Sequence, residues 1–133
     1  MNASLYIKQV KGKGRGVFCK QHIRKDHVFE TAAVIVLPAR DYEAVTSSHL
    51  ADYFFNFDKD AGTLALVLGF GSLYNHAVYS NAAYSLNKET RTMSYYALED
   101  IPPGTEICIN YAGEQGREFK EWFEARDIDY KDS

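Results

Sequence analysis

Short stretches in which apolar and polar residues alternate follow one another along most of this chain. Residues 5–10, Leu-Tyr-Ile-Lys-Gln-Val, are one example, because side chains of a β-strand point to opposite faces with a period of two. Turns rich in Gly, Pro, Asn or Asp separate the stretches at intervals of about ten residues. The pattern predicts strands at residues 5–10, 17–19, 28–30, 32–37, 63–68, 82–87, 92–97 and 106–111.

Two segments instead have apolar residues at helical spacing. The first begins near residue 47, with Ser47 or Ser48 as the N-cap. Its apolar face would consist of Leu50, Tyr53, Phe54 and Phe57. The second covers residues 114–126, and a weaker helical turn is predicted at 40–45. Because these helices do not alternate with the strands, a parallel α/β sheet is excluded, and a mainly β fold with short helices is predicted.

The composition is that of one folded domain. The chain has 133 residues, of which 46% are apolar, enough to bury a core. The net charge of -3 and an isoelectric point near 5.8 argue against a general nucleic-acid-binding protein. Cys19 and Cys108 lack the spacing of metal ligands or of a disulfide framework. With no signal peptide or apolar membrane span in the sequence, we expect an intracellular, soluble protein without a metal.

Three glycines at alternate positions, Gly12, Gly14 and Gly16, follow the first predicted strand. Glycine leaves main-chain N–H and C=O groups uncovered, so a polar ligand is able to lie against the backbone. The motif does not fit a dinucleotide-binding fingerprint, since its spacing differs and no helix follows it. Taken alone, it more often indicates a plain hairpin turn than a ligand site.

Asn75 and His76 follow a second bend, Gly69-Phe70-Gly71. An Asn side chain is able to orient a ligand or a neighbouring loop, whereas a single His is more often structural than a catalytic base. A hydrolase is disfavoured, because no Gly-x-Ser-x-Gly motif is present. The last predicted strand follows Gly104 and ends in Tyr111, one of ten tyrosines.

In this order, the three pieces resemble the signature of SET-domain protein lysine methyltransferases. The pieces are Gly12–Phe18, Asn75-His76 with Asn81, and Gly104–Tyr111. The resemblance covers roughly residues 4–112 and implies a SET-domain β-clip fold, in which the segments of Asn75 and Tyr111 cross in a knot-like arrangement near the C-terminus. It divides the chain into a SET domain, residues 1–112, and a post-SET-like C-terminal helix and tail, residues 113–133, with no zinc site.

The resemblance also implies roles for individual residues. Tyr111 matches the family's catalytic tyrosine, and S-adenosyl-L-methionine is the implied cofactor. The implied cofactor contacts are Lys13, Gly14, Arg15, Gly16, Asn75, His76 and Tyr111. The imidazole of His76 is expected to be largely structural. Tyr53, Tyr84 and Ile109 are implied walls of the substrate channel, and Trp122 and Phe123 are a candidate lid.

The match is incomplete in two places. The family's Asn-His-Ser-Cys-x-Pro-Asn is Asn75-His76-Ala77-Val78-Tyr79-Ser80-Asn81 here, which keeps both Asn residues and the His in register. The cysteine-rich zinc segments of many histone methyltransferases are missing, so the aromatic C-terminal helix would replace them as a lid or simply cover the core. Tyr84 and Ile109 favour different numbers of added methyl groups, which leaves the product open.

The sequence therefore predicts an S-adenosylmethionine-dependent protein lysine methyltransferase. Its partner would be a lysine-containing protein or peptide, with a histone tail as one candidate and no direct contact with nucleic acid or membrane. A homodimer is a further hypothesis, and the compartment would be the cytoplasm in a prokaryote or the nucleus if chromatin is the substrate. The alternatives are a catalytically inactive SET-fold peptide-binding module, an enzyme acting on a small molecule or a non-histone protein, and an unrelated β-rich carbohydrate- or peptide-binding domain.

Overall fold

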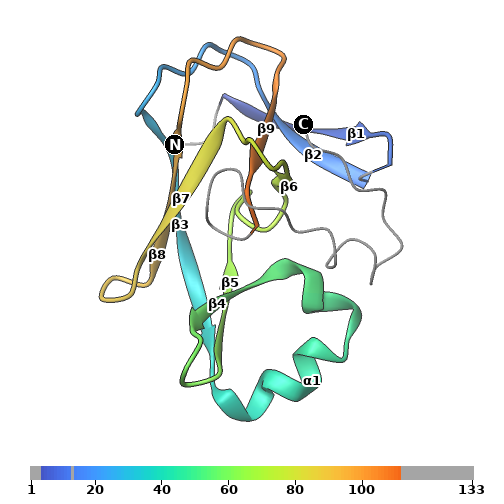
Figure 1. Ribbon diagram of the computed structural model, residues 1–133, viewed down its shortest axis with the longest axis vertical. Coiled ribbons are helices and arrows are strands. Elements are labelled where there is room, and N and C mark those ends of the chain that lie inside the picture. Colours follow the sequence, from blue (N-terminus) through green and yellow to red (C-terminus); the bar gives the residue numbers. More distant parts are fainter. Residues whose placement is uncertain (1–3, 13, 112–133) are drawn as a thin grey trace. The chain divides into compact units, whose positions relative to one another are not determined.

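The computed structural model describes residues 4–12 and 14–111, which form short strands and three brief helical segments (Figure 1). The strands are β1 (Leu5–Val10), β2 (Gly14–Cys19), β3 (Val28–Leu37), β4 (Phe54–Asp58), β5 (Thr63–Val67), β6 (Asn75–His76), β7 (Ala82–Asn87), β8 (Thr92–Ala97) and β9 (Glu106–Ile109). The helical segments are the 3-10 turns η1 (Ala39–Asp41) and η2 (His49–Tyr53) and the helix α1 (Tyr42–Thr46). The predicted mainly β class is confirmed.

The first sheet has the strand order β1-β2-β9-β6. β1 and β2 form an antiparallel hairpin that places Val10 opposite Gly14. β9 runs antiparallel to β2, and β6 runs parallel to β9, with Asn75 opposite Cys108 and His76 opposite Ile109 (Figure 1). The segment of the Asn-His pair and the strand that precedes Tyr111 are therefore neighbours in one sheet.

The second sheet has the order β4-β5-β3-β8-β7. The chain divides into two compact units, and β3, β7 and β8 each contribute residues to both. Within the described residues, the first unit comprises 4–12, 14–30, 73–84 and 95–111. The second unit comprises Thr31–Ser72 and Ser85–Ser94.

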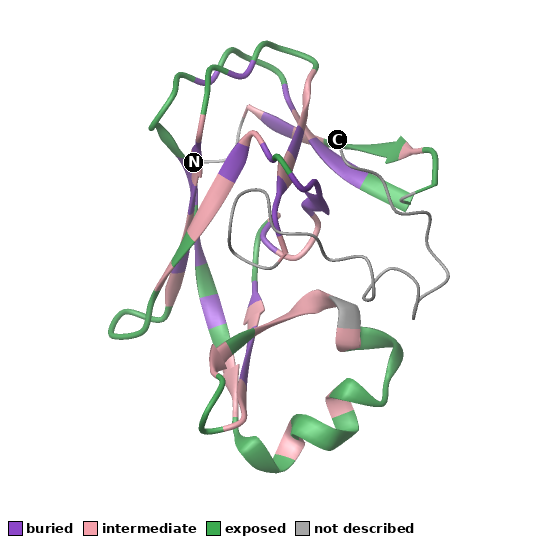
Figure 2. Ribbon diagram, in the orientation of Figure 1, coloured by how far each residue is buried: buried purple, intermediate pink, exposed green. Residues whose placement is uncertain are grey.

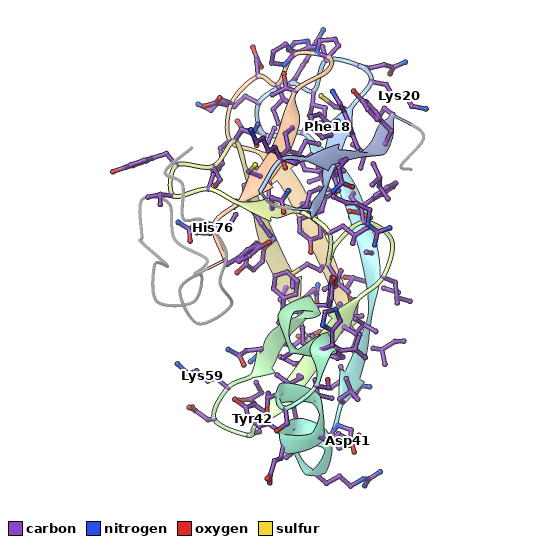
Figure 3. All side chains as sticks on the ribbon, turned by 90° about the vertical axis from the view of Figure 1, so that its right-hand side faces the viewer. Phe18, Lys20, Asp41, Tyr42, Lys59 and His76 are labelled. Carbon is purple, nitrogen blue, oxygen red and sulfur yellow. The ribbon has the colours of Figure 1, made fainter. Side chains whose placement is uncertain are left out.

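The core of the first unit follows the two-residue period of its strands. Val17, Ile107 and Ile109 have none of their surface exposed, and they belong to β2 and β9. Figure 2 shows that buried residues also make up β6. On the outer side of the hairpin, the Phe18 ring (labelled in Figure 3) stacks on Tyr6 at 5.6 Å, with the Lys8 ammonium 5.3 Å from its centre. The hairpin thus has one buried side and one solvated side.

The second unit buries Ala32, Val34, Leu64, Ala65, Val67 and Met93. In this unit β4 and β5 pair with each other, and β5 pairs with β3 so that Val34 lies opposite Val67. α1 buries none of its residues. No helix in the described part of the chain is long and apolar enough to cross a membrane.

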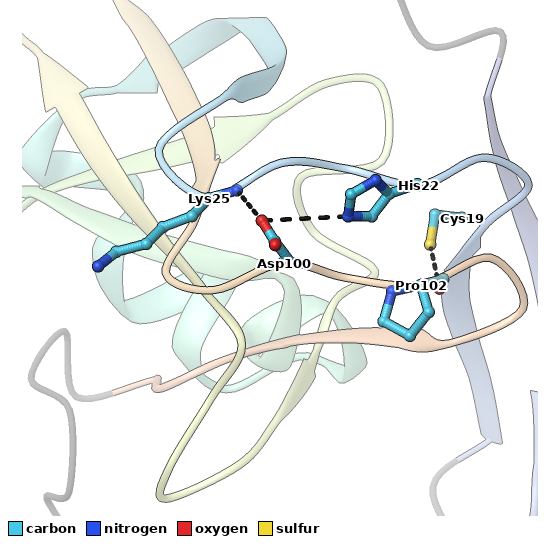
Figure 4. Close-up of polar contacts among 5 residues, drawn as sticks. All are labelled: Cys19, His22, Lys25, Asp100 and Pro102. Carbon is cyan, nitrogen blue, oxygen red and sulfur yellow. Dashed lines mark hydrogen bonds and ion pairs between the residues drawn. The ribbon is translucent and has the colours of Figure 1, made fainter.

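Two turns that each begin with an isoleucine lie side by side in the first unit. Ile23 and Ile101 pair through reciprocal main-chain hydrogen bonds of 2.9 and 2.8 Å. Three residues after each of them, Asp26 and Gly104 both have a positive φ, 70° and 80°. Asp100 Oδ1 accepts the main-chain N–H of Lys25 at 2.8 Å and lies 4.0 Å from exposed His22 (Figure 4). Left-handed backbone favours glycine, so Asp26 is a strained position.

Most predicted strands are confirmed, but the helix expected from residue 47 is wrong. Ser48 does cap a helical turn, accepting the Leu50 N–H at 3.1 Å, yet that turn ends at Tyr53 and β4 follows. Leu50 is 56% exposed, whereas Phe54 pairs with Leu66 across β5. Strand pairing of the aromatic residues outweighed their helical spacing.

Other boundaries also differ from the predictions, among them that of the last strand, because β9 ends at Ile109 and not at Tyr111. The segments 28–30 and 32–37 form the single strand β3, and the glycine turn is shorter than expected because Gly14 and Gly16 belong to β2. The helical turn at 40–45 is present as η1 and α1. The helix predicted at 114–126 lies outside the described residues.

Candidate active site

Tyr111 is attached at two points to the segment around β6. Its main-chain N–H donates to His76 Nδ1 at 3.0 Å, and its hydroxyl donates to the main-chain oxygen of Tyr74 at 2.8 Å. The His76 ring, labelled in Figure 3, lies 5.1 Å from the Tyr111 ring. Because Nδ1 accepts this bond, a neutral His76 carries its proton on Nε2. The buried imidazole thus joins the two neighbouring segments.

Asn75 connects the glycine strand to β9. Its Nδ2 donates to the main-chain oxygen of Arg15 at 3.2 Å and to Glu106 Oε2 at 2.6 Å. A Cβ at Gly16 would come within 3.0 Å of the Glu106 carboxylate, Val10 and the Asn75 amide, so these side chains would have to shift. The amide hydrogens of Asn75 are both used within the protein, which leaves Oδ1 and the Glu106 carboxylate as hydrogen-bond acceptors beside the glycine strand.

The second Asn of the motif fixes β9 in place. Asn81 Oδ1 accepts the Cys108 N–H at 2.9 Å, and its Nδ2 donates to the Glu106 main-chain oxygen at 2.9 Å. Buried Asn110 donates in the same way to the Val78 main-chain oxygen at 3.0 Å. The loop after β6 and the strand before Tyr111 are therefore locked together by side-chain amides as well as by the ladder.

Tyr74, whose main-chain oxygen accepts the Tyr111 hydroxyl, belongs to a buried cluster with Glu30 and Tyr95. The Tyr74 hydroxyl donates to the Glu30 carboxylate at 2.5 Å, and the Tyr74 ring packs 4.6 Å from Tyr95. Glu30 is 1% exposed and Tyr74 is 2% exposed. Burial raises the pKa of both tyrosines, and the negative charge of Glu30 raises it further. Both phenols therefore stay neutral at physiological pH.

Tyr84 joins the cluster to a cavity. Its ring lies 6.2 Å from Tyr95, and its hydroxyl donates a long hydrogen bond of 3.4 Å to the main-chain oxygen of Tyr111. Burial raises the pKa of Tyr84. The cavity beside it has a volume of about 190 Å³ and is lined by Ser80, Ala82, Ala83, Tyr84, Tyr96, Leu98 and Asn110. A tyrosine next to a small cavity is able to contact a ligand there.

The remaining predicted site residues fall into four groups. Gly14 and Arg15 are exposed on β2, in the strand that Asn75 holds. Ile109 is fully buried beside His76. Tyr53 belongs to the second unit, where its main-chain oxygen accepts from Ser72 Oγ at 2.8 Å. Lys13, Trp122 and Phe123 lie outside the described residues.

Two residues of the site were not predicted from the sequence. The sequence indicates Glu106 only as a member of the motif Gly104–Tyr111, and Glu30 only as the end of a strand. A signal for Glu30 was nevertheless present, since it falls on the buried phase of β3 with Ala32 and Val34. A carboxylate at a core position is expensive to bury and therefore indicates a specific partner.

Comparison with known proteins identifies the family. The SET-domain family model matches residues 14–112. The chain belongs to the SET-domain family. A relative from Schizosaccharomyces pombe, "Histone-lysine N-methyltransferase, H3 lysine-37 specific", is 30% identical over 112 residues, which cover 84% of this chain and 75% of the relative.

Two solved structures show the same fold. A Plasmodium falciparum protein, crystallised as a candidate histone methyltransferase, is 25% identical with a TM-score of 0.70, covering 88% of this chain and 100% of that one. The Neurospora SET-domain protein DIM-5, a histone lysine methyltransferase, is 21% identical with a TM-score of 0.64, covering 86% of this chain and 54% of that one. The SET-type fold expected from the sequence is confirmed.

The residues around Asn75 fit the cofactor that the SET family implies. The amino-acid end of S-adenosylmethionine carries an ammonium group, and Asn75 Oδ1 and the Glu106 carboxylate are acceptors of the right kind. Gly14 has a φ of 77° and no atom within 4 Å of a Cβ placed on it, so its backbone is uncovered. Among residues 4–12 and 14–111, no three His, Cys, Asp or Glu side chains are grouped to hold a metal ion.

Proposed function

We propose that this SET-domain chain is a protein-lysine N-methyltransferase that uses S-adenosylmethionine. The observation that carries the proposal is the double attachment of Tyr111 to the segment of Tyr74 and His76, directly beside Asn75. A tyrosine used only for packing does not need its main chain and its hydroxyl both held. Similarity to named histone-lysine methyltransferases supports the same class of reaction.

Asn75 and Glu106 would hold the cofactor by its ammonium group. When bound, S-adenosylmethionine supplies an electrophilic methyl group on a sulfonium. Asn75 Oδ1 and the Glu106 carboxylate accept hydrogen bonds from a cation, and the main chain of Gly14 and Gly16 allows close approach. Because Asn75 itself is held by Arg15 and Glu106, its amide is oriented before the ligand binds.

Tyr111 would act as an oxygen acceptor. Its hydroxyl hydrogen is already donated to the Tyr74 main-chain oxygen, so the phenol oxygen presents its lone pairs. Such an oxygen is able to accept weak C–H···O contacts from a polarised methyl group and to help align the amine with it. In-line methyl transfer needs alignment in a dry site and forms no oxyanion, so a hydrogen-bond donor is not required there.

The substrate lysine must lose a proton before it reacts. From a reference pKa of about 10.4, deprotonation at pH 8 requires roughly 3 kcal/mol. Burial of the amine beside another cation lowers its pKa and offsets this requirement. Tyr84 is a poor base at neutral pH, because burial raises the pKa of its phenol. No general base is needed, and the proton would leave to water.

A basic peptide is the proposed substrate class. The net charge of -3 suits a lysine-rich partner, and extended peptides commonly add as a strand to an exposed sheet edge. The fission-yeast relative is named for lysine 37 of histone H3, so an H3 tail peptide containing that lysine is the first candidate. With such a substrate the protein would act in the nucleus.

Titration calorimetry with S-adenosylmethionine, followed by transfer of a radiolabelled methyl group, tests the proposal. Label is offered to core histones, to H3 peptides with single Lys→Arg changes, and to a whole-cell lysate. Label lost from one Lys→Arg peptide would identify the site, and mass spectrometry of the product would count the methyl groups. Binding without transfer would favour an inactive SET-fold module, and a folded sample that binds no cofactor would refute the proposal.

A further inference from the structure

We propose that Glu30 is a positioning residue for Tyr111, acting through Tyr74. The Glu30 carboxylate holds the Tyr74 hydroxyl, and the main-chain oxygen of Tyr74 holds the Tyr111 hydroxyl. The inference rests on the proposed function for its effect on turnover, but the placement of Tyr111 is also measurable without turnover.

The first step is the weakness of the backbone around Tyr74. This residue directly precedes β6, which has only two residues and two ladder pairs with β9. So short a strand does little to fix the direction of the preceding carbonyl group. The position of Tyr74 is instead fixed by its side chain, which is 2% exposed. Its ring packs against Tyr95 at 4.6 Å and Phe29 at 6.1 Å.

The second step concerns the hydrogen bond that anchors the Tyr74 hydroxyl to Glu30. A phenol that donates to a carboxylate makes a charge-assisted hydrogen bond, which is shorter and stronger than a neutral one. The distance of 2.5 Å between Tyr74 Oη and Glu30 Oε1 agrees with this. Glu30 lies on the buried phase of β3, so the anchor belongs to a longer strand than β6 does. The carboxylate thus ties the residue before a two-residue strand to a ten-residue strand.

The third step is the result at Tyr111. The segment 74–76 holds the main-chain N–H of Tyr111 through His76 and its hydroxyl through the Tyr74 carbonyl. If Tyr74 loses its anchor, the carbonyl is free to rotate, and the Tyr111 hydroxyl is no longer held by a fixed acceptor. A small misplacement of a group that aligns reactants is enough to lower turnover about 100-fold.

Tyr74→Phe is the principal test, because it removes the hydroxyl and keeps the ring packing. We expect kcat to fall at least about tenfold, while the dissociation constant for S-adenosylmethionine stays within about twofold, since Asn75 and Glu106 are untouched. Glu30→Ala should lower kcat similarly, and Glu30→Gln should restore most of it by providing an acceptor oxygen. In the Glu30→Ala background, adding Tyr74→Phe should cause little further loss.

A purely structural role for Glu30 must be distinguished from positioning. Val34→Ala is the matched control, because it removes buried side-chain volume from the second unit and should destabilise the protein without changing kcat. The second readout is the ¹⁹F NMR signal of 3-fluorotyrosine placed only at position 111. We expect it to shift or broaden in Tyr74→Phe and to remain unchanged in Val34→Ala.

The two proposals fail in different ways. If kcat and the ¹⁹F signal of Tyr74→Phe match those of the unchanged protein, the positioning role is refuted while the methyltransferase proposal stands. If the unchanged protein transfers no methyl group, the methyltransferase proposal fails, and the ¹⁹F signal alone decides whether Glu30 and Tyr74 position Tyr111. Should Glu30→Ala not fold, Tyr74→Phe with Glu30→Gln still decides the question.

Discussion

The two units of this SET domain bury different kinds of side chain. In the described part of the first unit, the buried residues include Glu30, Asn75, His76, Ser80 and Asn110. In the described part of the second, the buried side chains are all apolar: Ala32, Val34, Leu64, Ala65, Val67 and Met93. Burying polar groups is unfavourable unless each is hydrogen-bonded, so they are kept where a fixed geometry is needed.

Because of this difference, substitutions in the two units should affect stability and activity to different extents. The apolar sheet of the second unit gains stability from area removed from water, a contribution that has no direction. The polar residues of the first unit make directional bonds, among them those from Asn75 to Arg15 and Glu106 and those from Tyr111 to Tyr74 and His76. Changes in the first unit should therefore alter activity out of proportion to stability, and changes in the second should do the reverse.

Tyr111→Phe should produce the largest effect on activity. Removing the hydroxyl leaves the ring packed beside His76 but deletes the acceptor oxygen and its bond to the Tyr74 carbonyl. We expect turnover to fall on the order of 100-fold, with stability lowered by about 1 kcal/mol. Steady-state kinetics and calorimetry with S-adenosylmethionine on the same sample check both. Turnover equal to that of the unchanged protein would contradict the proposed role.

Asn75→Ala should affect both properties, because this side chain joins β2, β6 and β9. Removing its amide deprives the Arg15 carbonyl and the Glu106 carboxylate of a donor. We expect a loss of about 2 kcal/mol in the free energy of unfolding and a clear fall in cofactor affinity. Asn87→Ala is the matched control, since Asn87 caps an exposed turn of the second unit through the N–H groups of Glu89 and Thr90. Equal effects of the two changes on cofactor affinity would argue against a site at Asn75.

Val34→Ala tests the prediction that a change in the second unit lowers stability without changing activity. Val34 is 8% exposed and lies opposite Val67 in the ladder of β3 and β5. Loss of its methyl groups should lower the free energy of unfolding by about 2 kcal/mol, measured by urea denaturation. Below the temperature at which unfolding begins, kcat and cofactor affinity should not change. A fall in kcat at full occupancy of the folded state would show that the two units are not separable in this way.

The pH dependence of stability should report the buried phenols of the first unit. Burial raises the pKa of Tyr95, whereas in the unfolded chain it is about 10. Below pH 10 both states keep the proton; above it the unfolded state loses the proton first, so stability falls as pH rises. The Tyr95 contribution at pH 11 is about 1 kcal/mol. Tyr95→Phe should therefore lose about that much less stability than the unchanged protein between pH 9.5 and 11, as measured by urea denaturation.

Most strands could be predicted from the sequence because buried and more exposed side chains alternate along them. In β8, Met93, Tyr95 and Ala97 are buried in alternation, and the predicted bounds of this strand are those observed. The helix from residue 47 could not be excluded in the same way. The spacing of four between Tyr53 and Phe57 fits both periods. The pairing of Phe54–Asp58 with β5, across the turn at 59–62, decided in favour of a strand.

The candidate site was predictable to the extent that motif residues are brought together by one sheet. Asn75, His76 and Tyr111 meet because β6 and β9 are parallel neighbours. The family resemblance implied only that the two segments cross, and periodicity did not show even that. Glu30 and Glu106 were missed because no local pattern reveals a partner far along the chain. Their cofactor and positioning roles, like those of the motif residues, stay predictions until the experiments above are done.

Asp26→Gly should produce the smallest effect, and in the opposite direction. Asp26 has a φ of 70°, and the equivalent position of the paired turn is Gly104 with a φ of 80°. Glycine adopts this conformation without the clash of a Cβ, so we expect a gain of about 0.5 to 1 kcal/mol in the free energy of unfolding, while the Asp26 N–H still donates to Ala97.

Gly104→Ala is the matched change of opposite sign. A Cβ at Gly104 would meet no atom within 4 Å, so its loss of stability, about 1 kcal/mol, would come from the backbone conformation alone. Both turns belong to the first unit but contribute no residue to the site, so urea denaturation should show opposite shifts while kcat stays constant. A change in kcat with either variant would mean that activity depends on the stability of the whole unit and not on its buried polar residues.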